Sequence, residues 1–314
     1  MKKNLLVLMI FILTIMTGCG NDNAIKEDSN SQNFYVVTDD AGRTVEFTKK
    51  PERVVSVSAS FLEPWGAVGG EVVGRPSSKK PIPEFAKDAA EIGAVYQIDT
   101  EKLLACKPDL VIVNKGMNEK LSTILEENKI PCIVVDMKTY DNAKKNIEIF
   151  SQLTGQPEKG KQIVEEMDAK IKNILDKLPE EKKRVAILHS TAQGLSVQLD
   201  NSIAGNVLKI LGWENVASGM TAADDKTDTA PYSLETLIEQ NPEIIFITSM
   251  GDIDEIKAAM DKRLAENPAW QTIPAVKNNQ FYYLPQDLFL LSPGIHYPEA
   301  VEYVAKLIYP EDFK

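Results

Sequence analysis

The sequence predicts an α/β fold with two parallel-sheet α/β lobes bridged by one long α-helix. The first observation is a repeat. Residues 99–113 and 233–247 each contain a helix-capping residue, a short helix with a glutamate at its second position, a Pro–acid pair and an apolar run. Such a β-branched run is typical of a buried parallel strand. The second observation is a helical stripe of apolar residues over 158–178, between the two copies. The third is the length of 314 residues, which favours two domains of roughly 100 to 200 residues each.

The expected elements of the first lobe, residues 34–157, alternate between strands and helices, as in a parallel α/β sheet. A β-hairpin comes first, because turn residues at 39–43 separate two strand-like runs. After the hairpin we expect, in order, a strand at 54–58, a helix at 61–68, a strand at 72–74, the first copy of the repeat, a helix at 119–128, a strand at 131–136 and a helix at 141–153.

The second lobe, residues 179–314, follows the bridging helix predicted over 158–178 and continues the alternation. We expect, in order, strands at 184–188 and 195–199, a helix at 204–211, a loop at 216–231, the second copy of the repeat, a helix at 254–264, a strand at 280–284 and a terminal amphipathic helix at 298–308. Both lobes therefore share one pattern of elements.

The N-terminus has the features of an export signal. Two lysines precede an apolar run over 5–16, which is too short to span a bilayer, since a spanning helix needs about 20 apolar residues. The sequence Met16–Cys19 resembles a bacterial lipobox, with Met where Leu is usual. We therefore expect a lipoprotein signal peptide and lipobox over 1–19, lipid on Cys19, and a disordered tether over 20–33. An ordinary secretory signal with an incidental cysteine is the alternative.

The composition excludes several classes of function. A net charge of −11 argues against a nucleic-acid partner. Cys106 and Cys132 lie in apolar runs without a CxxC pattern, so a thiolate metal site is not indicated. With only His189 and His296 in the chain, a three-histidine metal site cannot form. The string 194–198 lacks the final glycine of a nucleophile elbow and no HExxH is present, so we expect no enzyme. We expect a monomer.

Candidate site residues lie beyond the carboxyl ends of the expected strands, where open α/β sheets bind ligands. In the first lobe these ends carry Ser58, Ser60, Asn114, Lys115, Met137 and Lys138. In the second lobe they carry His189, Ser190, Ser249 and Met250. Tyr96 and Tyr232 precede the two copies of the repeat in equivalent places, and Trp65 is a candidate flat apolar wall, although a single Trp on a helix is more often part of the core.

The runs 37–45 and 51–56, together with both copies of the repeat, resemble the iron-chelate and cobalamin class of ABC-transporter substrate-binding proteins. The resemblance covers nearly the whole mature chain. It implies two lobes joined by a long helix, a ligand cleft between them and little hinge motion. It also implies that Glu101 and Glu235 dock into arginine pockets of an ABC permease dimer, which works with a separate ATPase. Both carboxylates would also favour their own helix N-termini, by about 0.3–1 kcal/mol.

Three segments, 73–78, 91–96 and 275–279, are similar to Gram-positive heme-receptor lipoproteins. In that subfamily the residue at the place of Tyr96 coordinates heme iron, as Met in the best-known members, and phenolate is a recognised heme ligand. The second axial ligand is a His on the far lobe, and the position matched to it here holds Met250. His189 could substitute from the same lobe.

Heme therefore ranks slightly ahead of a ferric siderophore, with cobalamin third, and no intrinsic cofactor is expected. A siderophore would need basic residues facing the cleft, and the candidates are Arg75, Lys79, Lys115 and Lys138. A surface lipoprotein that kept the fold without transport is the alternative from a different class. The expected location is the extracytoplasmic face of the cell membrane, through the lipid anchor.

Overall fold

The computed structural model describes residues 34–78, 81–191, 194–222 and 227–314. The predicted signal peptide, Cys19 and the tether lie outside these residues, as does Lys79. Within the described residues there are two six-stranded sheets and one two-stranded hairpin. No helix in this part of the chain is long and apolar enough to cross a membrane.

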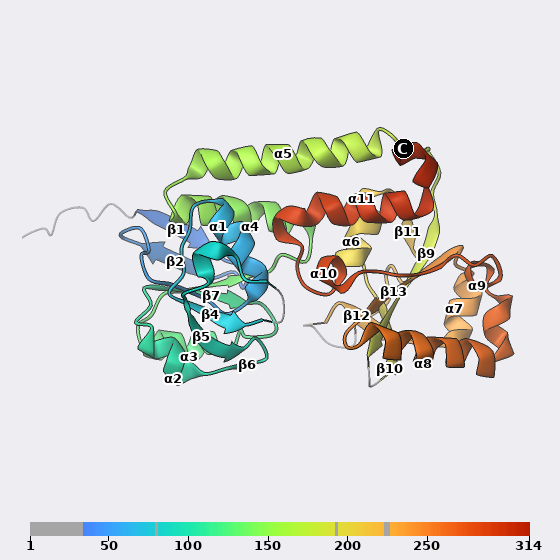
Figure 1. Cartoon of the computed structure of the whole chain (residues 1–314), viewed down its shortest axis with the longest axis horizontal. Coiled ribbons are helices and arrows are strands. Elements are labelled where there is room, and N and C mark those ends of the chain that lie inside the picture. The colour runs from blue at the N-terminus through green and yellow to red at the C-terminus, as the bar shows by residue number, and fades with distance from the viewer. Residues whose placement is uncertain (1–33, 79–80, 192–193, 223–226) are drawn as a thin grey trace, which may run out of the picture. The chain divides into compact units, whose positions relative to one another are not determined.

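The N-terminal lobe contains the hairpin, the first sheet and four α-helices (Figure 1). Its sheet has the strand order β6-β5-β4-β3-β7-β8, and all neighbours are parallel except β5 and β6. The strands are β1 Tyr35–Thr38, β2 Thr44–Phe47, β3 Val54–Ser56, β4 Gly74–Ser77, β5 Ala90–Ala94, β6 Gln97–Ile98, β7 Leu110–Asn114 and β8 Cys132–Val135. The α-helices are α1 Leu62–Ala67, α2 Thr100–Ala105, α3 Leu121–Glu127 and α4 Tyr140–Leu153.

The C-terminal lobe is built around the strand order β12-β10-β9-β13-β14, with β11 also paired to β9. Its β9, β11, β13 and β14 are parallel, whereas β10 is antiparallel to both β9 and β12. The strands are β9 Arg184–Thr191, β10 Gly194–Gln198, β11 Glu214–Asn215, β12 Thr229–Pro231, β13 Ile244–Ser249 and β14 Phe281–Tyr283. The α-helices are α6 Ile203–Ile210, α7 Leu234–Gln240, α8 Ile253–Glu266, α9 Pro274–Lys277, α10 Gln286–Phe289 and α11 Tyr297–Ile308.

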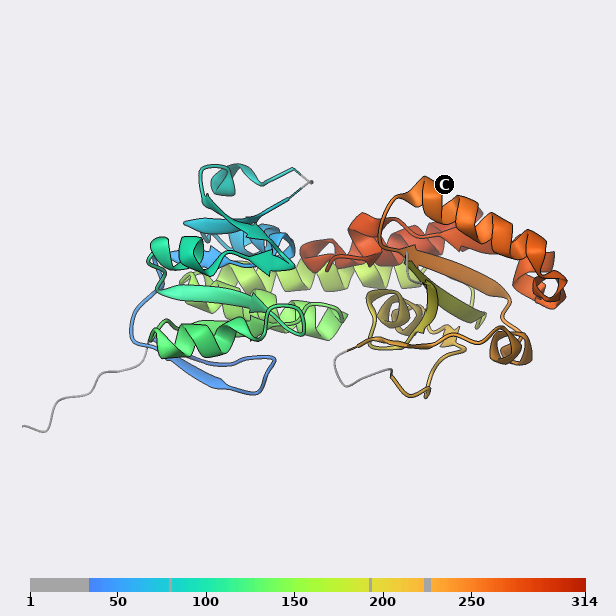
Figure 2. The same cartoon turned by 90° about the horizontal axis from the view of Figure 1, so that it is seen from below.

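The helix predicted between the lobes is α5, Pro157–Leu175, and its 19 residues give a length of about 28 Å. Its buried face, which includes Met167 and Ile171, belongs to a core cluster shared with α4 of one lobe and α11 of the other. Figures 1 and 2 show α5 passing along both helices. The predicted fold class is thus confirmed.

The repeat predicted from the sequence forms the same unit in both lobes. The side chains of Asp99 and Ser233 accept hydrogen bonds from the N–H groups at the third helical positions of α2 and α7. A residue with positive φ follows each helix, Lys107 at 48° two residues after α2 and Asn241 at 51° directly after α7, and a proline comes next in both cases. A left-handed residue ends a helix, and the proline prevents its continuation. Strands β7 and β13 then enter their sheets.

Alternate residues of each central strand enter different cores. In β9, Val185 and Ile187 belong to the cluster shared with α5, while Ala186 and Leu188 belong to a second cluster confined to the C-terminal lobe. β7 divides its apolar residues in the same way, and the separate cluster of the N-terminal lobe includes the free thiols of Cys106 and Cys132. The shared cluster therefore joins one face of each sheet through α4, α5 and α11.

Buried polar contacts also join the lobes at the base of the space between them. The hydroxyl of the fully buried Tyr297 lies 2.8 Å from Asn206 Oδ1 and 3.0 Å from the carbonyl oxygen of Lys138, which are both acceptors. The Tyr140 N–H donates to the same Asn206 oxygen over 2.9 Å. We call Lys138, Tyr140, Asn206 and Tyr297 the tyrosine seam. It fixes the chain after β8 against α6 and α11.

Replacing Tyr297 by Phe should lower the free energy of unfolding by about 1–3 kcal/mol, because the Lys138 carbonyl loses its donor, whereas Asn206 Oδ1 keeps the Tyr140 N–H. Guanidinium unfolding followed by circular dichroism measures this change. Tyr303→Phe is the matched control, since Tyr303 lies on the same helix and is 37% exposed. Equal unfolding free energies for the two variants would contradict the role of the seam.

Candidate ligand-binding cleft

Two adjacent pockets lie between the lobes and share Ser60, Leu291 and Ser292. The first, the strand-end pocket, has a volume of about 310 Å³. Its polar lining residues are Ser58, Ser60, Asn114, Lys115, Asp136, Lys138, His189, Gln198, Thr227, Asp228, Thr229 and Ser292. Its apolar lining residues are Phe61, Val95, Met117, Met137, Ile203, Phe289, Leu290 and Leu291.

The strand-end pocket takes its name from its position. Ser58 and Ser60 follow β3, Lys115 follows β7, and Lys138 follows β8, while His189 lies near the end of β9 in the other lobe. The carboxyl ends of parallel strands meet at one edge of a sheet, so residues far apart in the sequence converge there. The structure thus brings together Ser60, Lys115 and His189, three of the candidate site residues.

The side chain of His189 is held by one hydrogen bond inside the C-terminal lobe. Its Nδ1 lies 3.0 Å from Thr248 Oγ1. This contact orients the ring and leaves Nε2 without a hydrogen-bond partner among the residues that the structure describes. Burial lowers the pKa of His189, although the charge of Asp228 acts in the opposite direction. His189 therefore presents a neutral imidazole, the form that ligates metals.

One ion pair crosses the strand-end pocket. Lys138 Nζ of the N-terminal lobe lies 2.8 Å from Asp228 Oδ2 of the C-terminal lobe. Lys115, the other basic residue among the described residues that line this pocket, has an exposed side chain. The pocket thus combines cationic and acceptor groups with apolar walls.

Tyr96 and Met250 lie outside the lining of both pockets. Tyr96 is 81% exposed in the turn between β5 and β6, directly after Val95, which lines the strand-end pocket. The Asn118 side chain holds this turn by donating to the carbonyl of Val95 over 2.6 Å. Met250 is 52% exposed directly after β13. The Tyr96 turn thus adjoins the pocket, and Met250 follows the strand that carries Thr248.

Two predicted aromatic residues belong to the cores instead of the cleft. Trp65 is 2% exposed, donates its Nε1–H to the carbonyl of Glu71 over 2.9 Å, and packs edge-on against Phe150. Tyr232 stacks on Trp270, with ring centroids 6.1 Å apart, against the second cluster of the C-terminal lobe. Neither lines the two pockets between the lobes. Trp65 thus has the core position that a single Trp on a helix more often takes, and Tyr232 packs within the C-terminal lobe.

Asp228, Gln198 and the segment 289–292 line the strand-end pocket and were missed by the sequence reasoning. Gln198 lies on β10, which is antiparallel to β9. The expectation that ligands bind at the carboxyl ends of parallel strands therefore does not apply to Gln198. Asp228 precedes the short strand β12 in a stretch expected to be a loop. Only the pairing of β12 with β10 brings Asp228 to the cleft, and such pairing leaves no local signal in the sequence.

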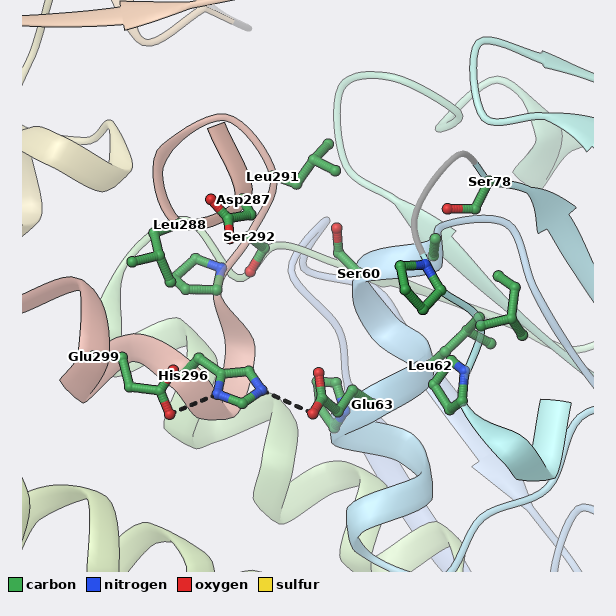
Figure 3. Close-up of a pocket in the computed structure, with 16 residues that line it drawn as sticks. Ser60, Leu62, Glu63, Ser78, Asp287, Leu288, Leu291, Ser292, His296 and Glu299 are labelled. Atoms are coloured by element: carbon green, nitrogen blue, oxygen red, sulfur yellow. Dashed lines mark hydrogen bonds and ion pairs between the residues drawn. The ribbon is translucent and has the colours of Figure 1, made fainter. Parts of the chain in front are cut away.

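The second pocket, the helix-side pocket, has a volume of about 360 Å³ and is lined by residues of α1, α10, α11 and the chain around them (Figure 3). His296 Nε2 lies 2.8 Å from Glu63 of α1, and its Nδ1 lies 2.8 Å from Glu299 of α11. Burial works against the charged imidazolium, but hydrogen bonds to Glu299 and Glu63 outweigh it and raise the pKa of His296. Two carboxylates facing both ring nitrogens favour the doubly protonated ring.

The comparisons with known proteins agree with this architecture. A family model described as periplasmic binding protein matches residues 54–288, more than half of the chain. The chain belongs to the periplasmic binding protein family.

Two relatives of the chain in this family match over almost the full length of both partners. The chain is 27% identical over 319 residues to the uncharacterized ABC transporter substrate-binding lipoprotein YvrC of Bacillus subtilis, covering 98% of this chain and 96% of YvrC. It is 24% identical over 309 residues to the high-affinity heme uptake system protein IsdE of Staphylococcus aureus, covering 98% and 97%.

Solved structures show the same fold as this chain. An ABC transporter substrate-binding protein from Listeria monocytogenes matches with a TM-score of 0.74 and 25% identity, over 83% of this chain and 100% of that one. Staphylococcus aureus IsdE complexed with heme matches with a TM-score of 0.72 and 23% identity, over 82% and 98%. At 23% identity, the similarity to the IsdE structure establishes the fold alone.

The two histidines should give the stability opposite pH dependences. Because the pKa of His296 is raised in the folded chain, its contribution is complete below about pH 6.5 and is lost as the pH rises through the raised value. Because the pKa of His189 is lowered, its contribution is complete above about pH 6.5 and is lost as the pH falls. Denaturant unfolding between about pH 5.5 and 8 measures both.

His296→Gln should remove the loss of stability above about pH 6.5, and His189→Gln should remove the histidine-dependent loss below it. Each variant is the control for the other, since the chain has no further histidine. An unchanged slope above pH 6.5 in His296→Gln would show that the Glu63–His296–Glu299 contact does not carry the charge assigned to it.

Proposed function

We propose that this protein is the extracytoplasmic, lipid-anchored substrate-binding component of an ABC importer for an iron complex, with heme as the favoured ligand. The observation that carries the proposal is the strand-end pocket between two lobes of the periplasmic binding protein fold, with the imidazole of His189 in its lining. The names of YvrC and IsdE, an ABC transporter substrate-binding lipoprotein and a heme uptake protein, support it.

Heme suits the chemistry of this cleft. The flat tetrapyrrole faces need apolar surface, which Met117 of the N-terminal lobe and Leu291 of the C-terminal lobe supply in the pocket lining. Phenolate and imidazole are both recognised ligands of heme iron. Tyr96, at the edge of the cleft in the N-terminal lobe, is the proposed iron ligand, and His189 or Met250 of the C-terminal lobe is the proposed second one. Ser60 and Lys115 are proposed to contact the periphery of the ligand.

A ferric siderophore is the second candidate, because Lys115 and Lys138 give the cleft two cationic groups. Cobalamin stands third. A surface lipoprotein without a transport role is the candidate from another class, and a transport assay separates it from the importer. Cys19 is the proposed site of the lipid anchor.

The proposed contacts with the permease dimer are Glu101 and Glu235. Both are exposed second residues of capped helices, α2 and α7, in separate lobes. Their equivalence within the repeat supports a matched pair of docking points, since two similar permease subunits would offer two similar sites. The ATPase is proposed to be a separate component.

Titration of the purified chain with hemin should shift the Soret band, and Tyr96→Ala should remove most of that shift by deleting the proposed iron ligand. Cobalamin and ferric siderophores, followed by absorbance and tryptophan quenching, test the alternatives. Tyr303→Phe serves as a control, because Tyr303 lies on α11 and lines neither cleft pocket. A Soret shift that is absent, or that is unaffected by Tyr96→Ala, would rule out the heme assignment.

Combined Glu101→Ala and Glu235→Ala substitutions should abolish transport in vesicles that contain the permease and ATPase, while ligand affinity stays unchanged. The expected loss follows from removing the charge on both proposed docking points. Glu158→Ala is the matched control, an exposed glutamate in the first turn of α5. Undiminished transport by the double variant would refute the docking assignment.

A further inference from the structure

The ion pair between Lys138 and Asp228 lies in the lining of the strand-end pocket, and its two side chains come from opposite lobes. Their main chains are held in place. The Lys138 N–H donates to Asp136 Oδ1 over 2.9 Å and its carbonyl accepts from the tyrosine seam, while the Asp228 carbonyl accepts from the Leu199 N–H over 2.8 Å. Only the two side chains need to move for the pair to separate.

Another carboxylate can readily replace Asp228 as the partner of Lys138. The Lys138 side chain is 42% exposed and the Asp228 side chain 22% exposed, so water screens their attraction. Ion pairs that are partly exposed contribute little to stability. A ligand carboxylate that enters the pocket would offer Lys138 the same charge-assisted hydrogen bond and would exclude water at the same time.

We propose that Lys138 is the carboxylate-recognition residue of the cleft and that Asp228 is its internal competitor, which a carboxylate of the bound ligand displaces. This inference rests on the proposed function and narrows its ligand class to iron complexes with free carboxylates. Propionates of heme and carboxylates of a siderophore share that chemistry. The seam and the Asp136 contact hold the Lys138 main chain, so its ammonium group stays within reach of the cleft.

The proposal predicts effects of opposite sign at the two residues. Lys138→Met should weaken hemin binding by about tenfold or more, because a charge-assisted hydrogen bond is lost. Asp228→Asn should tighten hemin binding severalfold, because the competitor is removed. If the pair served only to hold the lobes together, Asp228→Asn would leave hemin affinity unchanged or weaken it.

The test is a hemin titration of the full chain and its variants, repeated with hemin dimethyl ester, in which both propionates are masked. Both effects should disappear with the ester. The increase in hemin affinity caused by Asp228→Asn should also disappear when Lys138 is replaced by Met. This result distinguishes competition for Lys138 from a general effect of the changed net charge. Lys145→Met is the matched control, because Lys145 is 43% exposed and pairs with Asp40 over 2.8 Å outside both cleft pockets.

Titration with ferric citrate tests whether the recognised carboxylate belongs to an iron chelate other than heme. A ferric trihydroxamate, which has no free carboxylates, is the negative control. If the chain binds ferric citrate and not hemin, and the two substitutions change only citrate binding, the heme assignment fails and the carboxylate site stands. If hemin binds and depends on Tyr96, but Asp228→Asn does not tighten it, the competition is refuted and the heme assignment stands. A chain that binds neither carboxylate ligand overturns both.

Discussion

The structure depends on the way in which the two lobes are fixed to each other. The apolar face shared by α4, α5 and α11 joins one side of each sheet to a common cluster, and the tyrosine seam adds directional hydrogen bonds at the base of the cleft. Asn206 Oδ1 faces both the Tyr140 N–H and the Tyr297 hydroxyl, so a shift of either lobe would break buried contacts. Unpaired polar groups are costly where water is excluded, so these contacts favour the arrangement of the two lobes in this structure.

Much of the fold could be predicted from the sequence because its signals are local. The capped helices α2 and α7, the apolar runs of β7 and β13 and the stripe of α5 each lie within one short segment. β5 was missed because Ala90–Ala94 contains Ala, Glu and Gly, which strands disfavour, and only Ile92 is fully buried there. Its pairing with β4 makes it a strand. The antiparallel position of β10 also follows from its pairing with β9 and β12.

The candidate site was predictable to the extent that it follows from strand direction. Ser60, Lys115 and His189 converge because the carboxyl ends of parallel strands share an edge. Whether an aromatic side chain faces a cleft or a core depends on what packs against it. Trp65 packs against Phe150, and Tyr232 packs against Trp270, so both rings face the interior of their own lobe. Asp228 and Ser292 reach the pocket from segments without regular patterning, so only the tertiary structure reveals them.

A fixed base and exchangeable polar contacts make different contributions to recognition. A cleft that is organised in advance loses little conformational freedom on binding, which favours affinity for a rigid ligand. The contacts that cross the cleft above the seam, Lys138–Asp228 and Glu63–His296, are partly exposed and can be replaced without disturbing the shared core. Selectivity can then reside in these side chains while the lobes stay in place.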